Sequence, residues 1–101
     1  THYHDDAGYG SAVVILLCRY MLEGKSYKDA KELVSVNHKL KDSWEKIQKA
    51  ELKPDGYVFN VIHSALHFID NNKSLEDTFR FAGKANYCPI IFSVIKACLS
   101  E

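Results

Sequence analysis

The sequence predicts an all-α fold, a compact bundle of about six short helices. Apolar residues recur at helical spacing in successive segments, and no segment alternates as a half-buried strand does. Only 5 Gly and 2 Pro occur among 101 residues, which leaves little room for a loop-rich or all-β chain. The connections are short, so neighbouring helices are expected to be antiparallel. The length suits a single domain over residues 1–101.

The first half of the chain predicts three helices. Residues 10–22 are apolar on almost every side, which is typical of a central helix, and Gly24 follows as a C-cap. Ser26 is the expected N-cap of a second helix over residues 27–36. After a turn, apolar residues at the spacing of one helix face predict a surface helix over residues 40–50.

The second half predicts three more helices. A Pro-Asp-Gly turn within residues 53–56 precedes a helix over residues 57–70, whose wide apolar stripe indicates packing on a core. Ser74 opens a short helix that runs to about Ala82. Residues 88–99 form the last helix, which we expect to be buried nearly all round.

Composition and charge narrow the classes of function. Lys plus Arg and Asp plus Glu both number 13, and this balance argues against a dedicated nucleic-acid binder. The longest near-apolar run is too short to span a membrane. The three cysteines, Cys18, Cys88 and Cys98, are an odd number without close spacing, so we expect reduced thiols and a cytoplasmic location.

A few residues have types that could carry chemistry. The segment over residues 2–6 is rich in metal-ligand types, but a frayed polar terminus is the simpler interpretation, and a metal site would need further ligands. His63 and His67 lie four residues apart, as in zinc helices, but boundary packing is the simpler interpretation because no Glu lies between them. Cys88 lies at an expected helix N-terminus, which can lower a thiol pKa.

Three stretches, taken in order, resemble the ADP-ribosylglycohydrolase family. Thr1-His2 with Gly10-Ser11-Ala12 is similar to a Thr-His … Gly-Ala segment of that family. Residues 56–66 resemble its Gly-Tyr-Val-x-Asp-Thr-Leu-x-Ala-Ala-Leu helix. Residues 74–83 resemble the segment that leads into the family's metal-binding turn. The chain would cover about the last third of a typical member.

The resemblance implies an all-α fold that cleaves ADP-ribose from a modified group with two magnesium ions. The family's second set of metal ligands lies in a Gly-Gly-Asp-x-Asp-Thr turn. Here Lys84 and Asn86 stand at the two Asp positions, and Tyr87 replaces Thr. An ammonium beside a divalent cation is repulsive by several kcal/mol at an effective dielectric of ~20. We therefore expect no metal site, no catalytic residue and no cofactor in this chain.

A ligand site is still expected at the former metal turn. Lys84 would bind phosphate, and Asn86 and Tyr87 would donate hydrogen bonds to a ribose, next to Gly83. The residues expected to face this loop are His2, His4 and Asp5.

Three functions remain open. The first is a degenerate, metal-free relative that binds a protein partner or an ADP-ribose-like ligand. The second is a fragment or subunit of an active magnesium-dependent hydrolase, with carboxylates supplied from elsewhere. The third is a small helical interaction module. The two helices that are apolar nearly all round support the third, because a chain of this size buries only ~60–65% of its surface alone and a homo-oligomer or partner would cover the rest.

Overall fold

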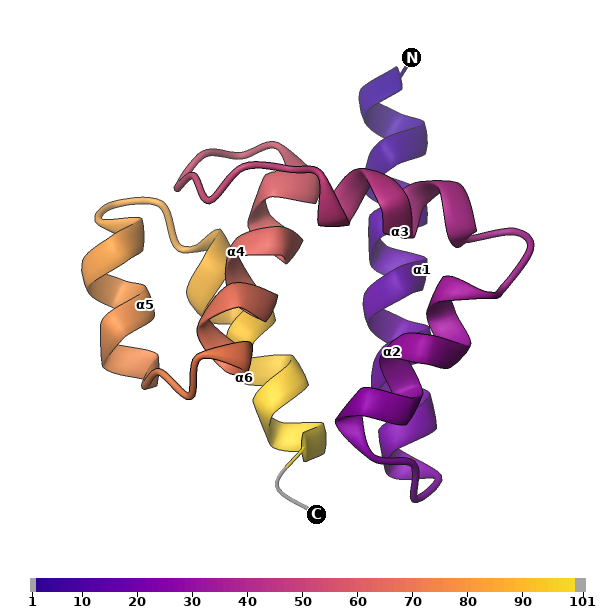
Figure 1. Cartoon of the computed structure of the whole chain (residues 1–101). Coiled ribbons are helices and arrows are strands. Elements are labelled where there is room, and N and C mark those ends of the chain that lie inside the picture. The colour runs from indigo at the N-terminus through magenta and orange to yellow at the C-terminus, as the bar shows by residue number, and fades with distance from the viewer. Residues whose placement is uncertain (1, 100–101) are drawn as a thin grey trace.

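The computed structural model describes residues 2–99, with side chains from residue 5 onward, and that part of the chain contains helices but no strand (Figure 1). The helices are α1 (His2–Leu22), α2 (Tyr27–Ser35), α3 (Lys41–Gln48), α4 (Val58–Asp70), α5 (Leu75–Ala82) and α6 (Tyr87–Leu99). The predicted all-α class is confirmed. Observed and predicted helix ends differ by no more than a few residues, except at the start of α1.

Two serine caps start helices where the sequence predicts them. The Ser26 hydroxyl accepts a hydrogen bond of 3.1 Å from the Asp29 N–H and opens α2. At α5 the capping is reciprocal, because Ser74 Oγ accepts from the Asp77 N–H and Asp77 Oδ2 accepts from the Ser74 N–H. These bonds satisfy backbone donors that have no partner inside a helix.

The first helix is longer than expected. It begins at His2, whereas the sequence predicts a start at Gly10. The frayed terminus expected for residues 2–6 is therefore wrong. No proline interrupts this segment, and Asp5 in the first turn interacts favourably with the helix dipole. The glycines at positions 8 and 10 disfavour a helix only weakly, and contacts with the rest of the fold outweigh that preference.

Helix α4 is the most enclosed element. Figure 1 shows it between α5 and α1, and it also contacts α3 and α6. Its Phe59 and Ile62 belong to one core cluster with Leu17 of α1, Ile47 of α3 and Phe92 of α6. The wide apolar stripe read from the sequence is thus confirmed as core. The core joins elements that are distant along the chain.

Helices α1 and α6 each leave an apolar face uncovered. Ile15 of α1 is 67% exposed, and Ile90 and Val94 of α6 are 57% and 45% exposed. The expectation that both helices are buried nearly all round is therefore wrong. The short helices of a 101-residue chain cover only their inner faces. Despite this apolar character, none of the described helices has the length and hydropathy required to cross a bilayer.

Two buried polar side chains of α4 hold the extended segment over residues 51–56. Asn60 Oδ1 accepts a hydrogen bond of 2.9 Å from the Glu51 N–H, and Ser64 Oγ accepts one of 3.2 Å from the Lys53 N–H. Asn60 is 8% exposed and Ser64 is fully buried. Their hydrogen bonds satisfy both the buried side chains and an otherwise irregular backbone.

Candidate functional site

A groove of about 410 Å³ with mainly apolar lining residues lies between α1, α4 and α6. Its walls include Val14 and Ile15 of α1 and Ile90 and Val94 of α6, and Val58 and Ile62 of α4 contribute to its floor. None of the described residues that line the groove carries a charge. We refer to this feature as the apolar groove.

The sequence of α6 explains why the apolar groove is uncharged. Lys96 is the one charged residue of this helix, and it lies outside the groove. The exposed positions Tyr87, Ile90 and Val94 follow one another at intervals of three and four residues, so they share a helix face. This apolar pattern is evident in the sequence, which predicts burial in the core rather than an exposed face.

The four predicted ligand residues near α6 lie in different settings. Gly83 is the C-cap of α5, with a φ of 60° that favours glycine. Lys84 and Asn86 are exposed in the loop that follows. Tyr87 is the first residue of α6 rather than a loop residue, which corrects the expectation, and it lines the apolar groove. Only Tyr87 of this set lines that groove.

The predicted partners on α1 are described only in part. The side chains of His2 and His4 lie outside the described residues. Asp5 is exposed on the first turn of α1. The contact that the structure does show for this end of α1 involves Asp6, whose Oδ2 lies 3.4 Å from the Tyr57 hydroxyl. That Asp5 faces Lys84 therefore stays a prediction.

The histidine pair on α4 has a structural role. His63 Nδ1 lies 2.8 Å from the Ile47 carbonyl oxygen, and since a carbonyl only accepts, Nδ1 donates. This bond joins α4 to α3. His67 is half-buried one turn later. Within the described side chains, no group of three His, Cys, Asp or Glu residues could hold a metal ion.

The thiol of Cys88 does not lie in the setting that the sequence predicts. Its side chain is buried, and burial raises the pKa of the thiol to about 11. The lowered pKa expected at a helix N-terminus is therefore wrong, because desolvation of the thiolate dominates. Burial and a hydrogen bond with Cys98 raise the pKa of the Cys18 thiol to about 12. At neutral pH these thiols are poor nucleophiles.

A comparison of the sequence and the structure with protein-family models, curated proteins and solved structures finds no match. The likeness to ADP-ribosylglycohydrolases, carried by residues 56–66 and 74–83, stays a prediction.

Proposed function

We propose that this chain is a non-catalytic helical binding module of ADP-ribosylglycohydrolase type whose apolar groove binds a protein partner. The observation that carries the proposal is the exposure of Ile15, Ile90 and Val94 around one uncharged groove. Removing such surface from water stabilises a complex by roughly 25 cal/mol per Å². The described lining has no carboxylate, imidazole, amine or thiol, and its hydroxyl groups are those of Ser11 and Tyr87, so the groove suits binding better than catalysis.

A second copy of the chain is the partner that the charge pattern favours. In a two-fold dimer the same surface meets itself, so a charged residue at its centre would face a like charge. The groove lining is uncharged, and the whole chain has a formal net charge of zero. Neither local nor long-range repulsion opposes such a pairing.

Light scattering over a dilution series of the purified chain tests the proposal. We expect a concentration-dependent dimer, and we expect Ile90→Glu to stay monomeric because it places a charge in the apolar groove. Val36→Glu is the matched control, since Val36 is 74% exposed and does not line the groove. A chain that is monomeric throughout, or two variants that associate equally, would contradict the proposal. Circular dichroism verifies that both variants fold.

An ADP-ribose-like ligand is the second candidate. Tyr87 lines the groove, where its ring could contact the ligand, and Lys84 is exposed three residues earlier, where its ammonium is accessible to a phosphate. A third candidate, part of an active hydrolase, requires magnesium ligands from another chain or region.

Thermal melting with ADP-ribose, with and without magnesium, separates these candidates. A rise in melting temperature without magnesium that Lys84→Ala abolishes supports the ligand site. Lys39→Ala, another exposed lysine in a turn, is the matched control. A rise that requires magnesium supports the hydrolase fragment. The absence of any shift leaves the protein-binding module.

We also infer a cytoplasmic location. The three cysteines are unpaired, and Cys18 and Cys88 are buried as thiols within the core. Free thiols of this kind are typical of reducing compartments.

A further inference from the structure

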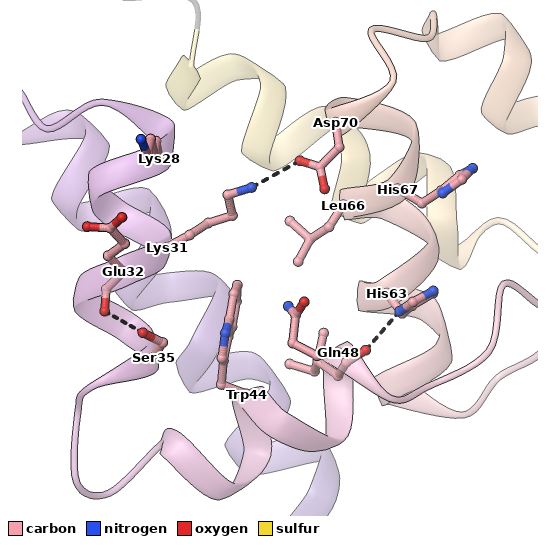
Figure 2. Close-up of a pocket in the computed structure, with 11 residues that line it drawn as sticks. Lys28, Lys31, Glu32, Ser35, Trp44, Gln48, His63, Leu66, His67 and Asp70 are labelled. Atoms are coloured by element: carbon pink, nitrogen blue, oxygen red, sulfur yellow. Dashed lines mark hydrogen bonds and ion pairs between the residues drawn. The ribbon is translucent and has the colours of Figure 1, made fainter.

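A second concave site lies on another part of the molecule, between α2, α3 and α4 (Figure 2). Its volume is about 360 Å³, which falls within the range of roughly 300–1,000 Å³ of small-molecule sites. Ile47 and Leu66, both buried, contribute its apolar base. We refer to it as the Trp44 pocket.

The groups that face the space are an aromatic ring and an amide. Figure 2 shows the indole of Trp44 standing along one side, with the Gln48 amide and the Leu66 side chain reaching toward the same space. The half-buried indole offers a face on which a flat ring can stack. The amide both donates and accepts hydrogen bonds, so it can bind the polar edge of a heterocycle.

One ion pair and one hydrogen bond hold the helices around the Trp44 pocket together. The ion pair between Lys31 Nζ and Asp70 Oδ1, at 3.2 Å, joins α2 to α4. The hydrogen bond from His63 Nδ1 to the Ile47 carbonyl oxygen joins α4 to α3. A pocket whose walls are held together loses less conformational entropy when it binds a ligand.

The rim of the pocket carries two lysines and two carboxylates, and the lysines are the groups that could bind an anion. Asp70 is already engaged, since its Oδ1 accepts from Lys31 Nζ and, at 2.7 Å, from the Tyr27 hydroxyl. Lys28 forms no ion pair with another described residue, and Lys31 has further ammonium protons to donate. Glu32 also belongs to the lining, but Figure 2 shows its carboxylate directed away from Trp44 and Gln48.

We propose that the Trp44 pocket binds a flat heterocycle that carries a phosphate, the chemistry of a mononucleotide. The ring stacks on Trp44 with its polar edge at the Gln48 amide, and the phosphate contacts Lys28 and Lys31. This site is separate from the apolar groove and from Lys84, and it does not depend on the family resemblance.

Tryptophan fluorescence tests the proposal directly, because Trp44 is the one tryptophan of the chain. Titration with adenosine monophosphate is expected to quench the emission to saturation, whereas adenosine binds more weakly and inorganic phosphate leaves the emission unchanged. Calorimetric titration with the same nucleotide gives an independent dissociation constant. A quench that does not saturate, or equal responses to nucleotide and adenosine, would overturn the proposal.

Variants at the rim make the test residue-specific. Lys28→Gln is expected to weaken nucleotide binding about fivefold, the effect of one exposed charge pair worth about 1 kcal/mol. Lys39→Gln is the matched control, since this exposed lysine lies outside the pocket, and it should leave the affinity unchanged. Equal affinities of these two variants would overturn the assignment of the phosphate to Lys28. Lys84→Ala should also have no effect here, which separates this site from the ligand loop.

Discussion

Gly10 of α1 lies so close to Val58 of α4 that no side chain fits between them. A Cβ placed on Gly10 would fall 2.6 Å from Val58 Cγ2 and 3.1 Å from Ile62 Cδ1. The missing side chain lets the backbone of α1 pack directly against side chains of α4. Since all three residues also line the apolar groove, this close contact shapes it.

Replacement of Gly10 by alanine is therefore expected to destabilise the fold. Val58 has a β-branched side chain near the start of a helix, so its rotamer cannot change freely. We expect Gly10→Ala to lower the free energy of unfolding by about 1–3 kcal/mol, measured by urea denaturation. Gly8→Ala is the control, because a Cβ there meets nothing within 4 Å. It should stabilise α1 by about 0.5–1 kcal/mol, and stabilisation by both changes would refute the close contact.

A carboxylate introduced at Asn60 is expected to destabilise the fold through charge repulsion. Its Nδ2 donates to both carboxylate oxygens of Asp55, at 3.3 and 3.1 Å. Asn60→Asp would place two carboxylates side by side, and we expect it to lower the free energy of unfolding at neutral pH by about 1–3 kcal/mol.

The pH dependence of the free energy of unfolding of Asn60→Asp tests whether charge repulsion causes the loss. Repulsion raises the pKa of the carboxylate pair in the folded state, so the loss should shrink as the pH falls and one carboxyl takes a proton. Asn86→Asp adds the same charge at an exposed site and should have little effect. Urea denaturation at neutral and acidic pH measures both. A loss that is independent of pH would show that packing, not charge, is responsible.

Several helix starts and the apolar stripe of α4 were predictable because neighbouring residues in the sequence determine them. Ser26 and Ser74 accept hydrogen bonds from backbone N–H groups three residues later, so their effect is visible in the sequence. The apolar spacing of α4 also predicted its burial. In contrast, the approach of Gly10 to Val58 joins residues separated by nearly half of the chain, so the local sequence does not predict it.

The candidate sites were less predictable because each joins distant segments. The sequence predicts Trp44 on the apolar face of a surface helix, but nothing near it in the sequence indicates that Lys31 of α2 and Leu66 of α4 lie around it. The apolar character of Ile90 was evident, but its exposure depends on which elements are left to cover α6. The positions of the cysteines in the sequence also do not indicate that Cys18 and Cys98 lie near each other.

The Cys98 thiol on α6 is near enough to help raise the pKa of the Cys18 thiol on α1, and this proximity predicts a specific disulfide under oxidation. A cross-link that closes so long a loop can stabilise the chain by about 4 kcal/mol. We expect prolonged oxidation, slow because the buried Cys18 thiol retains its proton, to join these two residues, leave Cys88 reduced and raise the urea midpoint. Peptide mass spectrometry identifies the bond. Cys98→Ser should remove both the bond and the added stability, and pairing with Cys88 would contradict the arrangement of α1 and α6.

Alkaline pH should destabilise the fold through Cys88. Burial raises its pKa from 9.0 to about 11, so the folded state retains the thiol proton that the unfolded state loses. This stabilisation is complete below pH 9 and is lost as the pH rises toward 11, with a loss of about 1 kcal/mol near the middle of that range. Urea denaturation at several pH values measures it. Cys88→Ala should show a shallower decline, to which Cys18 and Tyr27 still contribute because burial raises the pKa of both groups. Equal declines in both proteins would mean that Cys88 ionises as freely in the folded chain as in the unfolded one.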